Sequence, residues 1–495
     1  GIVEKTMRIQ EDPVQLLKRE DGTTKNITLL DKQHIHNNRL QVINQYEIDR
    51  GEGGARYANR YDVTVLVNGL PMVHIELKRR GVHIREAFNQ INRYSRDSFW
   101  AGSGLFDYVQ LFVISNGTHT KYYANTVRRS HLEEQTRRRS RRSTSNSFEF
   151  TSWWADGNNR PIQDLIAFTK TFFAKHSLLN VLTKYCVLTA DQQLLVMRPY
   201  QIVATERILR RIDIATNYKK LGSVDAGGYI WHTTGSGKTL TSFKTAQLAT
   251  QQHSVDKVLF VVDRKDLDHQ TMREYDRFQK GAANSNTSTR VLQQQLEDPA
   301  AKIIITTIQK LSNFVQGNKG HEIFSGHVVI IFDECHRSQF GDMHRAITKA
   351  FSQYHLFGFT GTPIFADNAH GSGVNKRTTK DLFGECLHKY VITDAIRDEN
   401  VLKFSVEYYK GFRVKEGSLQ KDIQVEDIDG REAYEWNKRL EAIVDFIIAN
   451  HDRKTHSRDF TAMMAISDVE TLTKYYEIFK RKKDAGEHNL RIATI

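Results

Sequence analysis

The chain has 495 residues, of which 39% are hydrophobic and 26% are charged, and these values predict two to four globular domains rather than a disordered or fibrous chain. The net charge of +13 fits either a polyanionic partner such as nucleic acid or a basic enzyme without one. The longest apolar runs, "VLFVV" and "HVVIIF", are much shorter than the roughly 18 residues of a membrane span. Three widely spaced cysteines, Cys186, Cys335 and Cys386, argue against a disulfide framework or a zinc site and fit a reducing cytoplasm.

The pattern of residues 1 to about 125 predicts a mixed α/β region. Two strand-like runs surround an Asn-Gly turn signal in 60–81, a segment with helical periodicity follows at 84–99, and two more strand-like runs occupy 108–126. The composition then shifts to a polar, arginine-rich segment at 128–147. This segment is either a flexible solvated linker or a loop that contacts phosphates, and both interpretations stay open.

The first strand pair carries two acids and a lysine whose spacing could form a site. Asp62 opens one strand and Glu76 closes the next, and because side chains alternate along a strand, Glu76 and Lys78 share one face. If the turn takes three residues, 68–70, Asp62 lies directly opposite Glu76. Two adjacent carboxylates repel each other unless a divalent cation lies between them, and Mg²⁺ fits such oxygen ligands. The alternative is a surface hairpin with ordinary charges.

From about 180 to 395, strand-like and helix-like segments alternate, which predicts a doubly wound parallel sheet. A new unit begins near residue 400, with helices expected at 435–451 and 468–483 and a strand expected at 461–467. The chain ends in "LRIATI", which resembles the beginning of another strand.

A glycine-rich loop, "HTTGSGKT", follows the strand-like run "GGYIW" and precedes a helix. The backbone of such a loop can wrap around phosphates, and the helix N-terminus adds unpaired N–H groups and partial positive charge. Lys238 would contact the β- and γ-phosphates of ATP, and the Thr239 hydroxyl would bind Mg²⁺. His232 replaces the usual first glycine of the motif, but the tight turn is kept. The candidate nucleotide-binding residues of the loop are Thr234, Gly235, Ser236, Gly237, Lys238 and Thr239.

A second element of the nucleotide site is the apolar run "HVVIIF", which ends in Asp333 and Glu334. In a doubly wound sheet, ligands bind at the carboxyl ends of the strands. Asp333 is therefore expected to hold Mg²⁺, and Glu334 to orient and deprotonate the attacking water. The alternative is a strand that ends in a solvated acidic turn.

Read in chain order, these stretches resemble the motifs of superfamily 2 helicases. "RPYQIVATERIL" is similar to the adenine-reading element, with Gln201 as the base contact, and "WHTTGSGKT" and "DECH" are similar to motifs I and II. "FTGTP" resembles motif III, in which Thr360 and Thr362 would couple the ATP state to DNA contact. The sequence contains no Q-x-x-G-R-x-x-R motif, so the second lobe is expected to continue beyond Ile495.

The N-terminal pattern resembles the D-x(n)-[DE]-x-K signature of restriction-type nucleases. "QINRY" matches the Q-x-x-x-Y element of RecB-like nucleases, in which Gln90 and Tyr94 lie one helical turn apart. With both sets of motifs on one chain, the sequence resembles the R subunit of type I restriction enzymes. They imply three regions: a restriction-endonuclease-like mixed-sheet domain at 1–170, a RecA-like lobe at 171–395 and the start of a second, incomplete RecA-like lobe at 396–495.

This resemblance implies ATP and Mg²⁺ as cofactors and double-stranded DNA as substrate, which the subunit moves and then cuts remote from a recognition site. It also implies methyltransferase and specificity subunits as partners, a bacterial cytoplasm as location and a helical assembly domain beyond residue 495. Three alternatives remain: a repair nuclease-helicase that resects DNA ends, an RNA remodeller with an inert N-terminal hairpin, and a non-catalytic scaffold.

Overall fold

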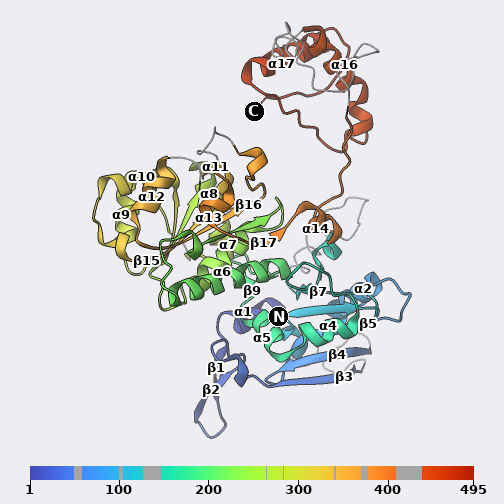
Figure 1. The fold of residues 1–495 in the computed structure, drawn as a ribbon. Coiled ribbons are helices and arrows are strands. Elements are labelled where there is room, and N and C mark those ends of the chain that lie inside the picture. The colour runs from blue at the N-terminus through green and yellow to red at the C-terminus, as the bar shows by residue number, and fades with distance from the viewer. Residues whose placement is uncertain are drawn as a thin grey trace. The chain divides into compact units, whose positions relative to one another are not determined.

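The computed structural model describes residues 1–49, 58–99, 104–125, 146–262, 265–281, 284–338, 342–369, 377–408 and 437–494. The chain divides into two compact units, residues 1–403 and 404–495. The first unit contains two large sheets of different construction (Figure 1). Of the arginine-rich segment at 128–147, all but the last two residues lie outside the described part of the chain.

The first large sheet is mixed, with the strand order β3-β4-β5-β6-β7-β8. Neighbouring strands are antiparallel except β5 and β6, which are parallel because helix α2 (Arg85–Asp97) crosses over between them. The strands are β3 (Leu40–Ile48), β4 (Asn59–Val67), β5 (Leu70–Leu77), β6 (Leu111–Ser115), β7 (Thr120–Ala124) and β8 (Ser152–Trp153).

Both faces of the mixed sheet are covered, so successive residues of its inner strands are buried alternately in one of two apolar clusters. One face packs against α4 (Leu165–Phe172) and α5 (Lys175–Thr183). The other face lies under α2, and Ile84, just before this helix, is buried together with Phe88 and Ile91, as their helical spacing predicts. The smaller elements around this sheet are α1 (Ile2–Gln10), β1 (Val14–Lys18), β2 (Thr24–Thr28), η1 (Ile35–Asn37), η3 (Leu105–Tyr108), η4 (Asn146–Phe150), β9 (Cys186–Leu188) and β10 (Leu194–Val196).

The β4–β5 hairpin has a shorter turn than predicted, but the predicted strand register is kept. The turn takes two residues, Asn68 and Gly69, both with positive φ (52° and 84°), so the expectation of a three-residue turn is wrong. A bulge then shifts the register by one residue, and Val63 pairs with Ile75. Continued by one position, this register places Asp62 opposite Glu76.

The second large sheet is parallel throughout, with the order β13-β14-β12-β15-β16-β11-β17. Its strands are β11 (Gly228–His232), β12 (Lys257–Val262), β13 (Asn284–Ser285), β14 (Ile303–Thr307), β15 (His327–Phe332), β16 (Gln353–Thr360) and β17 (Cys386–Tyr390). Alternate residues of the central strands enter two separate apolar clusters, one on each face. The expected doubly wound α/β fold is thereby confirmed.

Helices cover both faces of the parallel sheet (Figure 1). One face packs against α6 (Pro199–Asn217), α7 (Lys238–Ala249) and α8 (Lys265–Phe278). The other packs against α9 (Thr289–Glu297), α10 (Ile308–Gly317) and α12 (Asp342–Ala350). Shorter elements are η5 (Val224–Ala226), η6 (Glu322–Ser325), α11 (Cys335–Ser338), η7 (Ala366–Asn368), α13 (Thr379–Phe383) and α14 (Ile392–Arg397).

The second unit contains α16 (Asn437–Lys454) and α17 (Val469–Asp484), which pack through a small apolar core, so both expected helices are confirmed. The strand expected at 461–467 is wrong, because these residues form neither strand nor helix. A strand needs a neighbour to satisfy its backbone groups, and residues 437–494 provide none. The limits of the three predicted regions stay predictions. No helix in the described residues has the length and hydropathy that would let it cross a bilayer.

Candidate nucleotide and nuclease sites

The glycine-rich loop, residues 233–237, joins β11 to α7 and has a backbone that only glycine adopts easily. Gly235 and Gly237 have φ of 80° and 78°. No side chain caps the start of α7, so the N–H groups of its first turn and the positive end of its dipole are available to an anion. Thr234 is exposed, Ser236 is buried, and Thr239 lies half-buried in the first turn of α7. The predicted loop residues are therefore grouped around one helix N-terminus.

The start of α6 supports this loop from behind. The Gln201 amide nitrogen lies 3.3 Å from the Ser236 carbonyl and 3.2 Å from the Gly237 carbonyl, and the Gln201 side-chain oxygen accepts from the Arg198 N–H at 2.9 Å. The Tyr200 hydroxyl also donates to the Ser236 carbonyl, at 2.7 Å. Gln201 is 4% exposed, so this arrangement gives it a bracing role. The contact of Gln201 with adenine stays a prediction. To make that contact, the side chain would have to give up these hydrogen bonds.

The acidic pair follows β15, next to the loop. Lys238 Nζ lies 3.4 Å from Glu334 Oε1, and the Glu334 N–H donates to Asp333 Oδ1 at 3.0 Å. Glu334 has a positive φ of 43°, an unfavourable conformation for a residue with a side chain, and such strain often occurs at functional sites. Burial, reinforced by repulsion from Glu334, raises the pKa of Asp333 to about 6, while Lys238 opposes this shift. A divalent cation beside Asp333 would relieve that cost.

The last residue of β16, Thr360, is connected to this acidic pair through His336. His336 Nδ1 lies 3.5 Å from Glu334 Oε2 and forms a 2.9 Å hydrogen bond with Thr360 Oγ1. Thr360 Oγ1 also accepts from the Thr362 N–H at 3.0 Å. The two threonines of the predicted coupling motif are thus connected to the acid. The sequence did not single out His336, although its position two residues after Glu334 could have indicated it.

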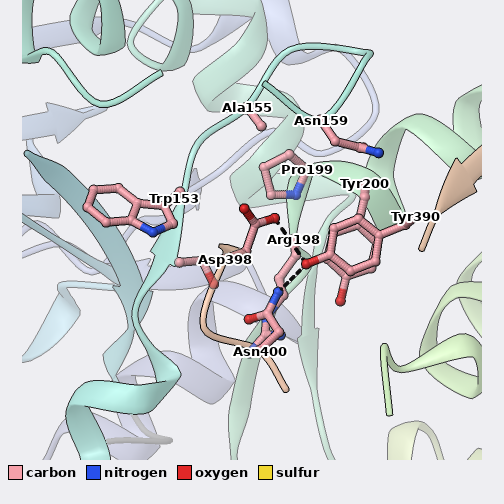
Figure 2. A pocket seen from close by; sticks show the side chains of 10 residues that line it. Trp153, Ala155, Asn159, Arg198, Pro199, Tyr200, Tyr390, Asp398 and Asn400 are labelled. Carbon is pink, nitrogen blue, oxygen red and sulfur yellow. Dashed lines mark hydrogen bonds between the residues drawn. The ribbon is translucent and has the colours of Figure 1, made fainter. Parts of the chain in front are cut away.

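A pocket opens at the start of α6, where Arg198, Pro199 and Tyr200 form part of its wall (Figure 2). Tyr200 and Tyr390 stack in its wall with ring centroids 3.7 Å apart. The Tyr390 hydroxyl donates to Asp398 Oδ2 at 3.0 Å and accepts from Asn400 Nδ2 at 2.6 Å. The motif "RPYQ" supplies only Arg198, Pro199 and Tyr200 of its walls, and the other lining residues come from distant segments that no motif identifies. They are lined by Ser152, Trp153, Ala155, Asn159, Arg198, Pro199, Tyr200, Tyr390, Asp398 and Asn400.

The candidate nuclease site forms on the face of β4 and β5 that α2 covers. Asp62 Oδ2 accepts from the Leu77 N–H at 2.8 Å, and Lys78 Nζ donates to Glu76 Oε1 at 2.9 Å. Glu76 is fully buried, while the Lys78 side chain is 21% exposed. Burial, and to a smaller extent the charges of Glu76 and Asp62, raise the pKa of Tyr94, so both carboxylates act on the same hydroxyl.

Helix α2 adds the two further predicted residues. Lys78 Nζ donates to Gln90 Oε1, Gln90 Nε2 donates to the Tyr94 hydroxyl, and that hydroxyl donates to the Arg60 carbonyl at 2.9 Å. The structure therefore brings Asp62, Glu76, Lys78, Gln90 and Tyr94 to one place. Their catalytic and metal-binding roles stay predictions.

The donor set of this site fits Mg²⁺. No group of three or more His, Cys, Asp or Glu side chains that could hold a metal occurs among the described residues. Mg²⁺ commonly binds through one or two carboxylates and keeps several waters, so Asp62 and Glu76 suffice. Glu76 Oε2 is buried without a hydrogen-bond partner, which marks this carboxylate as incompletely satisfied. A second buried group, His74, lies beside it and was missed, although strand alternation places it on the same face as Glu76.

Comparisons with known proteins match two regions of the chain to protein families. The family model of the type I restriction enzyme R protein N terminus matches residues 1–131, and that of the SWI2/SNF2 ATPase matches residues 200–439. An endonuclease subunit of a type I restriction enzyme from Staphylococcus aureus (strain MSSA476) is 41% identical over 494 residues, which is 99% of this chain. A Mycoplasma pneumoniae chain named as the C-terminal part of such a subunit is 48% identical over 204 residues, 40% of this chain and 99% of that relative.

The chain belongs to the family of type I restriction enzyme endonuclease subunits. The expected resemblance is thus confirmed. The chain spans about half the length of the Staphylococcus relative, 49%. A solved fragment named for the HsdR subunit of a type I restriction enzyme from Vibrio vulnificus YJ016 is 16% identical, with a TM-score of 0.37, over 90% of this chain and 70% of that one.

Proposed function

We propose that this member of the endonuclease-subunit family is an ATP-driven translocase of double-stranded DNA and a Mg²⁺-dependent endonuclease. It would act with methyltransferase and specificity subunits and cut DNA remote from the recognition site. The observation that carries this proposal is the presence of two chemically separate sites on one chain. One is the Lys238–Glu334 pair at a helix N-terminus, and the other is the Asp62, Glu76 and Lys78 set on a buried hairpin.

At the nucleotide site, the first turn of α7 and Lys238 would bind the phosphates of ATP. Nucleotide binding would separate Lys238 from Glu334 and leave the Glu334 carboxylate free to orient the attacking water. Thr239 and Asp333 would hold Mg²⁺. The contact from Glu334 through His336 to Thr360 would then report the state of the nucleotide to the segment after β16.

At the nuclease site, Asp62 and Glu76 would bind a Mg²⁺ ion, which polarises a phosphodiester and lowers the pKa of bound water. Lys78 is held between Glu76 and Gln90, so its ammonium group has a fixed position from which to stabilise negative charge on the phosphate. Tyr94 fixes Gln90 in turn. Because the groups proposed at both sites act on phosphates, metal and water, we assign sequence recognition to another subunit.

The test uses the subunit assembled with methyltransferase and specificity subunits on a circular DNA that carries one unmethylated site. We expect Lys238→Ala to lose ATP hydrolysis, translocation and cutting, and Glu76→Ala to lose only cutting. Lys349→Ala and Glu86→Ala are matched controls, because both residues are exposed on helices of the same two regions. Translocation is followed by displacement of a triplex-forming oligonucleotide from the DNA.

Full cutting by Glu76→Ala would remove the nuclease assignment. Translocation by Lys238→Ala at the unsubstituted rate would remove the motor assignment. A strict requirement for free DNA ends would favour the end-resecting repair enzyme instead.

A further inference from the structure

The two oxygens of the Glu76 carboxylate have different surroundings. Oε1 accepts from Lys78 Nζ at 2.9 Å, at the partly exposed edge of the site. Oε2 points inward, is inaccessible to solvent and has no hydrogen-bond partner. An unpaired buried carboxylate oxygen is costly, so a neighbouring donor is expected.

The neighbouring donor is His74, two residues earlier on β5. Its Nε2 lies 3.6 Å from Glu76 Oε2, both side chains have 0% exposure, and this nitrogen likewise has no hydrogen-bond partner. The distance is just beyond hydrogen-bond length, so a small rotation of the carboxylate closes it. These two incompletely satisfied atoms therefore face each other in a closed space.

The rest of the His74 ring is fixed. Nδ1 lies 3.3 Å from Thr64 Oγ1, and Thr64 is the residue directly opposite His74 on β4. The rings of Tyr61, Phe99 and Tyr94 stand edge-on to the imidazole with centroids 5.6, 5.5 and 6.1 Å away. This enclosure leaves the ring little freedom except to direct Nε2 toward Glu76.

We propose that His74 is a positioning residue for the nuclease site. Thr64 donates to Nδ1, which selects the tautomer with its proton on Nε2, and Nε2 donates to Glu76 Oε2. This relay fixes the plane of the carboxylate, so that Oε1 stays turned toward Asp62, Lys78 and the metal. The inference rests on the nuclease assignment proposed above. His74 itself touches neither metal nor DNA.

Partners of metal-binding groups set the affinity of a site, and their loss typically weakens metal binding by about 10- to 100-fold. We therefore expect His74→Leu to weaken Mn²⁺ binding by at least about 10-fold. His74→Gln should stay within about threefold of the unsubstituted chain, because its amide N–H can replace Nε2–H. Thr64→Val, which keeps the volume but removes the hydroxyl, should weaken binding by about three- to tenfold, since the ring loses its fixed tautomer.

Mn²⁺ binding to the 495-residue chain is measured by electron paramagnetic resonance without nucleotide, with Glu76→Ala as the blank for the nuclease site. ATP hydrolysis and the melting temperature are recorded for every variant. Restored binding in His74→Gln together with weak binding in His74→Leu supports the relay. If His74→Leu fails to fold, Thr64→Val and His74→Gln still decide the question.

Three results would overturn the inference: Mn²⁺ binding of His74→Leu equal to that of the unsubstituted chain, equal weakening in His74→Gln and His74→Leu at unchanged melting temperature, or unchanged binding in Thr64→Val. Failure of the nuclease assignment looks different. In that case Glu76→Ala and Asp62→Ala themselves bind Mn²⁺ and cut DNA like the unsubstituted chain.

Discussion

The nucleotide site and the nuclease site differ in which part of the chain builds them. The glycine-rich loop and the start of α7 form one continuous segment, and the groups proposed to bind phosphate are its backbone N–H groups and the ammonium of Lys238. The nuclease site collects side chains from β4, β5 and α2, and depends on a two-residue turn and a bulge for its register. A site built from contiguous backbone should be disrupted by substitutions at only a few positions of that segment. A site built from side chains should also be sensitive to substitution of the residues that hold those side chains in place.

The two sites also differ in their relation to solvent. Lys238 and Glu334 remain partly exposed, at 10% and 30%, and a phosphate can reach them from outside. Glu76 is fully buried and has only one oxygen directed toward the edge of its site. Because burial strengthens the effect of each hydrogen bond, the nuclease site should respond more to changes in neighbours that never touch DNA.

The largest effect is expected for Glu334→Gln. Loss of a general base typically slows a reaction by about 100- to 10,000-fold, so ATP hydrolysis should fall by that factor while ATP binding is retained. Steady-state hydrolysis and nucleotide titration measure the two quantities. Glu322→Gln changes an exposed acid of the same region and should leave both unchanged. Normal hydrolysis by Glu334→Gln would show that another residue orients the water.

The next largest effect is expected for Gly237→Ala, which tests whether the loop backbone is needed for ATP affinity. A Cβ here would lie 2.7 Å from Gln201 Nε2, at a φ of 78°. Strained conformations cost about 1–3 kcal/mol, so ATP affinity should fall by about 5- to 150-fold. Gly320→Ala is the matched control, since it has a φ of 83° and nothing within 4 Å. Equal ATP affinity in the two variants would contradict this role of the loop backbone.

A smaller effect, on DNA cutting, is expected for Gly69→Val, which tests whether the β4–β5 register is needed for the proposed nuclease site. Gly69 has a φ of 84° with nothing within 4 Å, so only backbone strain is added, of about 1 kcal/mol or somewhat more. DNA cutting should decrease while ATP affinity stays the same. Gly22→Val adds the same strain to the separate β1–β2 hairpin, at a φ of 79°. If both variants lower cutting equally, general stability rather than hairpin register is responsible.

The smallest effect concerns the contact between the two sheet regions. Lys121 of β7 is 4% exposed and pairs with Glu399, which follows α14, at 2.8 Å. The hydrogen bond from Lys121 lowers the pKa of Glu399 below its ordinary 4.5. Because Glu399 is largely exposed, Glu399→Gln should cost no more than about 1 kcal/mol of unfolding free energy.

The pH dependence of this pair follows from the lowered pKa. Its contribution is fully present above pH 4.5 and is lost as pH falls through the lowered pKa, since the folded state then binds the proton that the unfolded state already holds. The difference between Glu399→Gln and the unsubstituted chain in urea unfolding should therefore disappear in acid. A difference that grows in acid would contradict the assigned ion pair.

The glycine-rich loop, the acidic strand end and the strand–helix alternation were predictable because each depends on neighbours in the sequence. Glycine is needed where φ is positive, and apolar runs of strand length report burial on both faces. The Asp62, Glu76 and Lys78 set was also predictable, although the turn length was not. A two-residue turn followed by a one-residue bulge gives the same strand register as a three-residue turn, and the sequence pattern alone does not distinguish the two arrangements.

The sequence by itself determined which residues carry charge, where strand-like and helix-like segments alternate, and the family to which the chain belongs. Only the tertiary structure decided that His74 faces the inner oxygen of Glu76, that Gln201 braces the loop, and that Tyr200 stacks on Tyr390. The physical reason is distance along the chain. Local backbone preferences are encoded within a few residues, whereas the partner of a buried polar atom is chosen by which strands and helices pack together.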